Sequence, residues 1–202
     1  MLQRHYSQSS MIIAGEDIGK KFGKTWIFRH LDFQVKSGEP TVITGRNGAG
    51  KSTLLQIIAG YITPSHGKIV VDGINMDEST HKSVFIGPYS EIIEEFTLQE
   101  FLTFHEKFRT PVCSIQEMAD SASLPLNKMI GDFSTGMKQR TQLITAFFFE
   151  NDAIFMDEPT SNLDDEGFLW WEKEFKKLKS PLILLASNDK REIKCCINDL
   201  NL

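Results

Sequence analysis

Cysteine is scarce in this sequence of 202 residues, and its three copies form no recognisable pattern. The number is odd, and two of them, Cys195 and Cys196, are adjacent, with Cys113 far from both. A paired disulfide framework needs an even number, and zinc-type sites need C-x-x-C spacings that do not occur here. We therefore expect free thiols in a reducing compartment.

Long hydrophobic runs are also missing. No apolar stretch approaches the ~20 residues that a membrane-spanning helix needs. The first ten residues, MLQRHYSQSS, are polar and lack the apolar core of a signal peptide. We expect residues 1–10 to form a flexible extension, and we expect the chain to be soluble by itself. A membrane part, if the protein works at a membrane, would then belong to a separate chain.

Positive charge is in deficit, with 22 lysines and arginines against 27 aspartates and glutamates and a net charge of −5. A general nucleic-acid binder is more often basic, so we expect no nucleic-acid partner. The hydrophobic content of 41% and the charged content of 24% are ordinary for a globular protein. No repeat or long linker divides the chain, and we expect one domain over residues 11–202.

Apolar stretches bounded by turns alternate with segments of helical periodicity. Short strands separated by turns are expected between Met11 and Val42. Further strands are predicted at 41–44, 68–71, 83–86, 153–156 and 182–186, and helices at 51–59, 97–109, 114–121 and 137–149. Strands that alternate with helices favour an α/β fold with a mainly parallel sheet. The helical stretch near 97–150 has the character of an insertion or subdomain.

A glycine-rich loop carries the strongest chemical signal. Residues 45–52, GRNGAGKS, fit the pattern G-x-x-x-x-G-K-[ST], between a predicted strand and a predicted helix. Its backbone N–H groups and the positive end of the helix would hold phosphate oxygens. Lys51 would contact the β- and γ-phosphates, and Ser52 would bind Mg²⁺. The predicted phosphate-contacting residues are Gly45, Arg46, Asn47, Gly48, Ala49, Gly50, Lys51, Ser52 and Thr53. Kinases, GTPases, helicases and transport ATPases share this loop, so the loop alone does not identify the class.

Two carboxylates follow a buried strand. Asp157 comes directly after the apolar run 153–156, at the edge of the sheet where ligands bind in α/β folds. Asp157 would complete the Mg²⁺ site with Ser52, and Glu158 would polarise an attacking water as general base. The alternative is a solvated acidic turn.

The stretch from Phe133 to Arg140, FSTGMKQR, decides the class. It resembles the signature of the ATP-binding cassette (ABC) family, usually Leu-Ser-Gly-Gly-Gln followed by a basic helix start. Thr135 stands at the family's first Gly and Met137 at its Gln, whereas Ser134 and Gly136 are kept. Ser134, Thr135, Gly136 and Met137 are therefore the signature residues that the resemblance implies.

The resemblance covers roughly residues 11–200. Residues 157–164, DEPTSNLD, are similar to the family's Walker B motif and D-loop, with Asp164 as the D-loop aspartate. Residues 21–23 resemble the A-loop, which implies that the ring of Phe22 stacks on adenine through its π-face. Trp26 is a nearby rival for that role, and simple core packing is the alternative for Phe22.

The resemblance implies a P-loop NTPase core with an N-terminal antiparallel β part and a small helical subdomain, at about residues 90–140, that carries the signature. It implies ATP and Mg²⁺ as cofactors. Two cassettes, identical or different, would close head-to-tail around two ATP molecules, each held by one chain's phosphate loop and the other chain's signature. A separate transmembrane subunit would hold the protein on the cytoplasmic face of the cell membrane.

Two positions depart from the family pattern. Asn188 stands where the family has a switch histidine; its amide donates a hydrogen bond but is shorter and carries no charge. Residues 87–90, GPYS, stand where a Q-loop glutamine is usual. We expect slower hydrolysis with ATP binding intact. The region 89–105 is our candidate partner-facing surface through Glu91, Glu94 and Glu95, and a solvated acidic turn is the alternative.

The leading hypothesis is the nucleotide-binding subunit of an ABC transporter, more similar to exporter-type cassettes, including the haem-exporter kind, than to importers. One alternative is an ABC ATPase with an assembly or scaffold role. Another is a module that uses ATP as a clamp and hydrolyses it slowly. Asn188 and the missing glutamine favour the clamp, and Glu158 argues against it.

Overall fold

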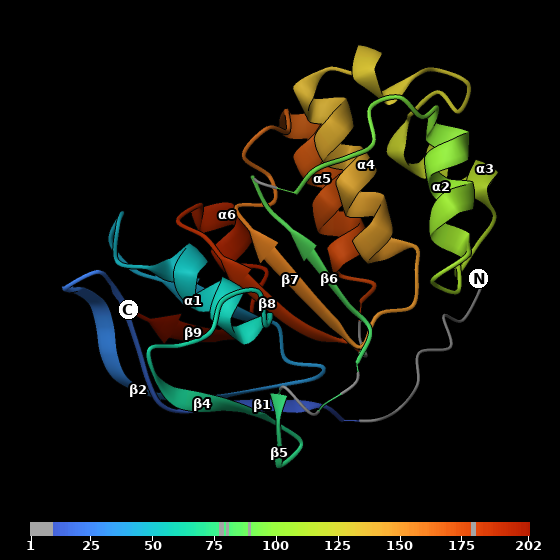
Figure 1. Ribbon diagram of the computed structural model, residues 1–202. Helices are drawn as coiled ribbons and strands as arrows, with labels where there is room; N and C mark the ends of the chain where they lie inside the picture. Colours follow the sequence, from blue (N-terminus) through green and yellow to red (C-terminus); the bar gives the residue numbers. More distant parts are fainter. Residues whose placement is uncertain (1–9, 77–78, 80, 89, 179–180) are drawn as a thin grey trace.

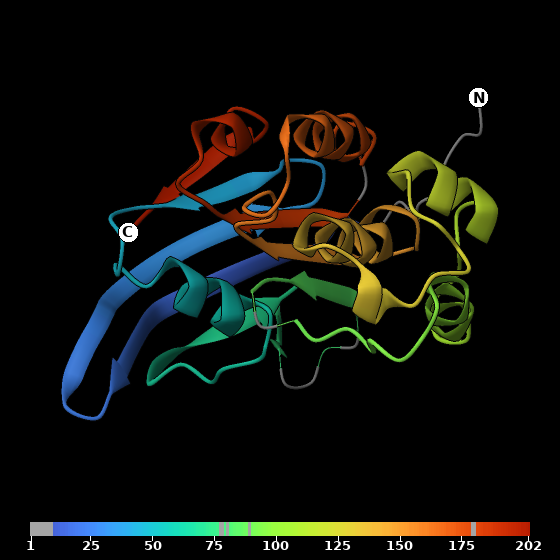
Figure 2. The same cartoon turned by 90° about the horizontal axis from the view of Figure 1, so that it is seen from above.

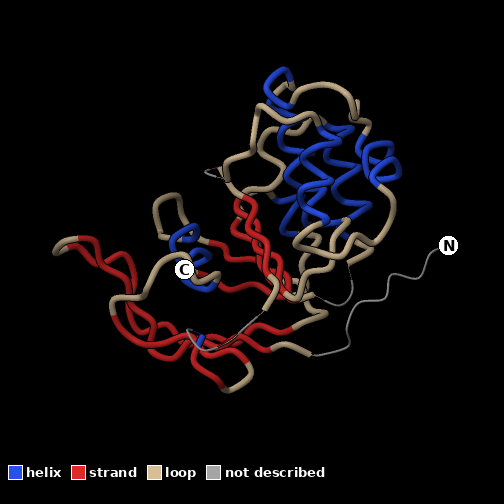
Figure 3. Tube along the Cα trace, turned by 45° about the vertical axis from the view of Figure 1, so that its right-hand side comes forward, coloured by secondary structure: helices blue, strands red, loops and turns tan. Residues whose placement is uncertain are grey.

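The computed structural model describes residues 10–76, 79, 81–88, 90–178 and 181–202. The predicted flexible extension, residues 1–10, therefore lies almost entirely outside the described residues. The described chain forms two sheets and several helices (Figure 1). Figure 3 shows most helices gathered at one end of the molecule and the strands at the other.

The first sheet is antiparallel, with strand order β2-β1-β4-β5. Its strands are β1 (Ile12–Phe22), β2 (Thr25–Lys36), β4 (His66–Val71) and β5 (Ile74–Asn75). β1 and β2 are a long hairpin of 11 and 12 residues rather than the short strands that the sequence predicts. The register shifts between Gly15 and Ile18, and Asp17 has a φ of 49°. Such bulges interrupt the apolar–polar alternation by which a long strand is recognised.

The second sheet is parallel in every pairing, with strand order β6-β7-β8-β3-β9. Its strands are β3 (Thr41–Thr44), β6 (Ser83–Ile86), β7 (Ala153–Asp157), β8 (Leu182–Ala186) and β9 (Asn198–Asn201). β3, β6 and β8 have the predicted bounds. Every residue of β3, β7 and β8 is buried, because both faces of a parallel sheet are covered.

The alternation of side chains along β7 divides the core in two. Ile154 and Met156 belong to a cluster with the helices α2 to α5, whereas Ala153 and Phe155 belong to a cluster with α1 and the antiparallel sheet. Helix α1 (Lys51–Ile58) lies on the same side as the antiparallel sheet, and α4 and α5 cover the other side (Figure 2). The buried parallel sheet thus forms the centre of a layered α/β fold.

Helices α2 (Leu98–Glu106), α3 (Ile115–Ala122), α4 (Thr135–Phe147) and α5 (Asp165–Phe175) form the helical end, with a short 3₁₀ turn at Ile130–Asp132. Thr97 and Glu100 form a capping box at the start of α2, and Ser114 and Glu117 form one at α3. A last helix, α6 (Lys190–Ile193), follows β8. Among the described residues, none of these helices has the length and apolar content that crossing a bilayer requires.

Candidate nucleotide site

The phosphate loop lies between β3 and α1, at the carboxyl ends of the parallel strands. Gly45, Gly48 and Gly50 have φ values of 147°, 81° and 102°, which side chains rarely tolerate. A Cβ on Gly50 would lie 2.5 Å from Cγ2 of Ile27 on β2, so the hairpin closes the space behind the loop. Gly50 caps α1 without a side-chain hydrogen bond. The first N–H groups of α1 therefore have no capping side chain from Gly50, which leaves them available to an anion.

Lys51 is the first residue of α1, and only 8% of it is exposed. Its Nζ donates to the carbonyl oxygens of Gly45, at 3.1 Å, and Arg46, at 3.3 Å. These bonds hold the ammonium group across its own loop. A single turn of backbone thus positions both the N–H groups and the positive charge that the sequence assigns to phosphate binding.

Ser52 and Asp157 meet at the mouth of the loop. The Ser52 hydroxyl donates to Oδ1 of Asp157 at 3.0 Å, although the two residues belong to different elements, α1 and β7. Burial raises the pKa of Asp157, and the Ser52 hydrogen bond and the Lys51 charge act in the opposite direction. Among the described residues, no group of three or more His, Cys, Asp or Glu could hold a metal ion. A hydroxyl with one carboxylate fits Mg²⁺, which keeps waters and phosphate oxygens as its other ligands.

Glu158 lies one residue beyond Asp157 at the end of β7. Its backbone N–H donates to the carbonyl of Ala186 at the end of β8, at 2.9 Å. Its φ of 46° lies in the left-handed region, which non-glycine residues adopt at a cost. Its side chain is exposed. The ends of two strands therefore impose the direction of Glu158, and its carboxylate is open to an incoming water.

Asn188 contacts the phosphate loop from the loop after β8. With Nδ2 toward Asn47, it donates to Oδ1 of Asn47 at 2.6 Å. With the amide turned over, Nδ2 donates to the carbonyl of Gly45 at 2.9 Å, and Oδ1 accepts from Lys51 Nζ at 3.0 Å. Either orientation places the amide against the residues that the sequence assigns to the phosphates. The position of Asn188 is that of a group able to reach a bound nucleotide.

Phe22 ends β1 at the tip of the hairpin, with 53% of its surface exposed. Its exposure is inconsistent with the alternative of simple core packing. Lys20 Nζ lies 5.2 Å from the Phe22 ring centroid. The rival, Trp26, is partly buried, and the Arg29 guanidinium lies 4.3 Å from its ring centroid. Phe22 therefore has the more accessible ring.

The signature residues begin α4 in the helical end. The Ser134 hydroxyl accepts from the backbone N–H of Met137 at 3.3 Å and so caps the helix. Gly136 lies against the carbonyl of Asn162, which a Cβ would approach to 3.0 Å. Figure 1 shows the start of α4 well separated from α1. One chain therefore does not bring its own signature to its own phosphate loop.

Asp164 caps α5, where its Oδ1 accepts from the Gly167 N–H at 2.8 Å and from Arg140 Nη2 at 3.1 Å. These bonds, the Gly167 N–H first, lower the pKa of Asp164. Asp164, the predicted D-loop residue, is thus tied to α4 through Arg140. No single-sequence signal distinguishes this role for Arg140 from a solvated charge on α4.

The stretch after β6 runs close to Asp157. A Cβ on Gly87 would lie 3.3 Å from Cβ of Asp157, and the Gly87 N–H donates to Ser90 Oγ at 3.0 Å. Position 89, singled out in the sequence, lies outside the described residues. Gln142 on α4 donates to the carbonyl of Ser90 at 2.5 Å. A glutamine amide from the signature helix therefore meets this segment, which sequence reasoning missed.

The three acidic residues of the candidate partner surface differ in their contacts within the chain. Glu94 Oε1 lies 2.5 Å from Lys138 Nζ on α4, so this carboxylate is already paired within the chain. Glu91 and Glu95 are exposed.

Two further contacts, which the sequence does not predict, hold the loop after β7. Gln139 donates to the Pro159 carbonyl at 2.9 Å, and Glu192 accepts from the Thr160 N–H at 2.9 Å.

Two solved structures share the fold over almost the whole chain. The first is titled "Putative ABC transporter (ATP-binding protein)" from Pyrococcus furiosus; its TM-score is 0.82 at 19% identity, over 95% of this chain and 97% of that one. The second is a dimeric ATP-binding cassette in a post-hydrolysis state bound to ADP and Pi; its TM-score is 0.80 at 22% identity, over 94% of each chain. These likenesses show the predicted α/β fold, with one parallel and one antiparallel sheet.

Among curated proteins, Nod factor export ATP-binding protein I of Rhizobium sp. (strain N33) is 30% identical over 92% of this chain and 65% of its own length. The cytochrome c biogenesis ATP-binding export protein CcmA of Rhizobium etli is 29% identical over 76% of each chain. The ribose import ATP-binding protein RbsA of Oceanobacillus iheyensis is 30% identical, over 35% of its length. The chain thus spans about two thirds of the length of the Nod factor export protein and about one third of the length of the ribose import protein.

The family profile described as "ABC transporter" matches residues 28–161, which is more than half of the chain. That stretch contains the phosphate loop, the signature and the Asp157–Glu158 pair, and the geometry places the hydroxyl of Ser52 against Asp157. The predicted family is therefore confirmed: this chain belongs to the ABC transporter family.

Proposed function

We propose that the chain binds and hydrolyses Mg-ATP as the nucleotide-binding subunit of an ABC transporter. The observation that carries the proposal is the hydrogen bond of 3.0 Å between Ser52 and Asp157 at the mouth of the phosphate loop. Two distant elements meet there in the arrangement that a Mg-nucleotide requires. Family membership and the names of the relatives support the same function.

In the proposed ground state, the loop N–H groups and Lys51 hold the phosphates. Ser52 and Asp157 would hold Mg²⁺, which neutralises phosphate charge when it is bound. Phe22 stacks on the adenine. Each of these groups binds without taking part in proton transfer, and together they position the γ-phosphate in front of Glu158.

In the proposed reaction, a water attacks the γ-phosphorus and the bond from that phosphorus to the β–γ bridging oxygen breaks. ADP leaves with the electron pair of that bond, and the proton of the water passes to the Glu158 carboxylate. Asn188 donates a hydrogen bond toward the γ-phosphate from its place beside Asn47. A neutral donor stabilises the developing charge less than a histidinium does, which supports slow hydrolysis.

We propose that two cassettes complete each site. The start of α4 lies apart from α1 in one chain, so Ser134, Thr135, Gly136 and Met137 would contact the ATP of a second cassette, identical or different, with Asp164 in the D-loop between them (Figure 1). Residues 11–202 would act as one domain whose helical part, about 90–140, carries the signature. ATP then joins the two chains, and hydrolysis releases them.

We further propose a separate transmembrane subunit as partner, which would place the chain on the cytoplasmic face of the membrane, and export as the direction of transport. The export names of two relatives support that direction, although ribose import and trehalose/maltose import proteins also match at 30% and 29% identity. The slow ATP clamp remains a second candidate, because Asn188 and the segment 87–90 lack the usual side chains.

Purification of the tagged chain from detergent-solubilised membranes of its source cells tests the transport role. We expect a multi-span membrane protein in fixed stoichiometry with the chain, and phosphate release by the complex that a Glu158→Gln complex lacks. Purely soluble partners in fixed stoichiometry would contradict the transport role and would favour an assembly ATPase. A membrane complex without phosphate release would favour the clamp.

A further inference from the structure

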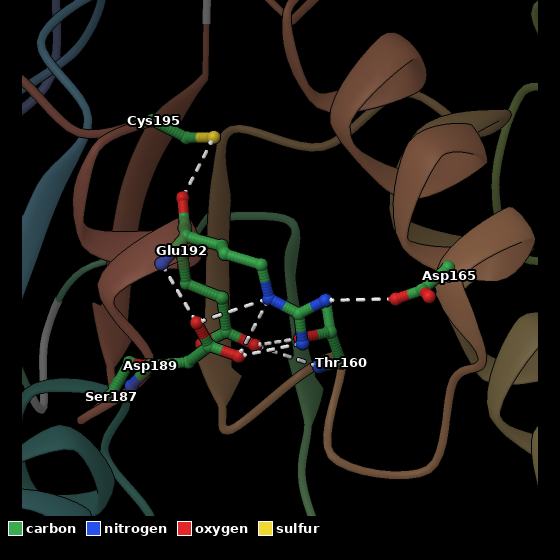
Figure 4. Close-up of polar contacts among 7 residues, drawn as sticks. Thr160, Asp165, Ser187, Asp189, Glu192 and Cys195 are labelled. Carbon is green, nitrogen blue, oxygen red and sulfur yellow. Dashed lines mark hydrogen bonds and ion pairs between the residues drawn. The ribbon is translucent and has the colours of Figure 1, made fainter.

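Glu192 is an acid buried in the core beside the candidate site, with 1% of its surface exposed. It lies on α6, and its Oε1 accepts hydrogen bonds from both the backbone N–H of Thr160, at 2.9 Å, and the Thr160 hydroxyl (Figure 4). The other carboxyl oxygen, Oε2, has no hydrogen-bond partner within the described part of the chain. No step of the proposed reaction uses this residue.

This contact joins the loop after β7, which contains Thr160, to helix α6, which directly follows the loop of Asn188. Thr160 lies in the loop that starts with Glu158, whose N–H is itself bound to Ala186. Glu192 is joined to the loop of Asn188 through a short turn, in which the Asp189 N–H donates to Ser187 Oγ at 2.9 Å and Asp189 Oδ1 accepts from the Arg191 N–H at 2.7 Å.

Other contacts hold the same two loops from outside. Arg191 forms an ion pair with Asp189 at 2.9 Å, and it reaches Asp165 at the start of α5 at 3.4 Å. Its guanidinium also lies 4.4 Å from the ring centroid of Phe168. The Arg191 contacts are exposed to solvent and hence weak, so the buried Glu192–Thr160 contact is the stronger connection between the loops.

A carboxyl in this place is not explained by stability. A buried polar group with an unpaired oxygen destabilises a core, and an apolar side chain of similar volume would pack there without that cost. Burial raises the pKa of Glu192, while the hydrogen bonds from the Thr160 hydroxyl and N–H act in the opposite direction. Unlike an apolar side chain, the carboxyl provides an oxygen, Oε1, that accepts from both the N–H and the hydroxyl of Thr160 in the neighbouring loop.

We propose that Glu192 is a positioning residue that couples the loop of Glu158 to the loop of Asn188, so that the general base and the switch residue move as one unit. The effect of the coupling on ATP turnover rests on the proposed function. The joint motion of the two loops, which is the mechanical part of the proposal, does not, because it concerns the chain without nucleotide.

Hydrogen–deuterium exchange of the full chain tests the mechanical part. In Glu192→Ala, we expect exchange to rise about tenfold in both 158–164 and 187–191, and to stay unchanged in the phosphate loop, 45–53. Glu192→Gln keeps the shared oxygen acceptor and should resemble the parent chain. Glu174→Ala is the matched control, because Glu174 is equally buried but lies on α5, where it pairs with Lys177.

Thr160→Val is the second variant, in case Glu192→Ala does not fold. It removes one donor in the first loop, and we expect exchange to rise by about threefold in 187–191, across the contact. An unchanged second loop in Thr160→Val, a rise confined to one loop in Glu192→Ala, or equal opening in Glu174→Ala would overturn the coupling.

Turnover adds a second readout. Relative to the parent, Glu192→Ala should lose about tenfold in kcat per ATP-binding site with KM within about twofold, and Glu192→Gln should restore the rate. A general loss of folded protein would instead lower the number of binding sites and leave kcat per site unchanged, which would overturn the positioning role. If the parent chain itself shows no turnover, the proposed function fails, and the exchange experiment still decides the coupling.

Discussion

The phosphate-loop side and the switch side of the candidate site are held together in different ways. Lys51 bonds to carbonyl oxygens five and six residues away, at Arg46 and Gly45, and the loop is shaped by its own glycines. The switch side instead depends on side chains from distant elements, such as Asn188 on Asn47, Glu192 on Thr160 and Gln142 on Ser90.

This difference explains where the chain keeps the family pattern and where it departs from it. A loop shaped by local backbone has little freedom to change, because each glycine occupies a conformation that side chains resist. A side built from long-range side-chain contacts tolerates another polar residue that reaches the same place. The comparison predicts intact ATP binding together with altered hydrolysis.

The largest expected effect is on the phosphate-loop side. Lys51→Ala should weaken ATP binding by about 100-fold or more, because it removes the charge that the loop holds over the phosphates. Titration calorimetry with Mg-ATP measures the affinity. Lys68→Ala is the control, since that lysine pairs with Glu16 on the antiparallel sheet and should not affect binding. An ATP affinity unchanged in Lys51→Ala would refute the assignment of the loop.

The next effect separates the two sides. Glu158→Gln should lower phosphate release by about 100-fold or more and leave ATP affinity within about twofold, because it removes only the proton acceptor. It should also accumulate an ATP-bound dimer, which light scattering after gel filtration detects. Turnover at the parent rate would show that Glu158 is not the base.

A smaller effect concerns the adenine end of the phosphate-loop side. Phe22→Ala should weaken ATP binding by about tenfold, because an aromatic ring stacked on a base contributes about 1–3 kcal/mol. Trp26→Ala should leave affinity nearly unchanged, since the Arg29 guanidinium already lies over that ring. Phe22→Tyr keeps a ring and serves as the control. Fluorescent ATP analogues report all three affinities, and the reverse order of Phe22 and Trp26 would transfer the role to Trp26.

Local sequence predicts the parallel strands on both sides of the site well. β3, β6 and β8 have the predicted bounds, and Asp157 lies at the end of its strand, as predicted. Buried parallel strands are short apolar runs between turns, which a single sequence displays clearly. The phosphate loop can be predicted equally well, because its function depends on residues that are adjacent in the chain.

The remaining features of the fold and the site depend on contacts between residues far apart in the sequence, which no short stretch of sequence contains. β9 is the polar stretch Asn198–Asn201, which is a strand because its backbone pairs with β3. The long hairpin is hidden by its bulges. Glu192, Gln142 and Arg140 resemble ordinary solvated residues in sequence, and their roles follow only from which loops the fold brings beside them.

Steady-state phosphate release from Mg-ATP by the parent chain and by Asn188→His tests the central claim most directly, with Glu158→Gln as background. We predict slow turnover above that background in the parent chain and about tenfold faster turnover in Asn188→His, at equal ATP affinity, because a histidinium bonds more strongly to the developing phosphate charge. Release at background level in both chains, or a parent rate that Asn188→His does not raise, would contradict the claim that a complete binding side is joined to a weakened switch side.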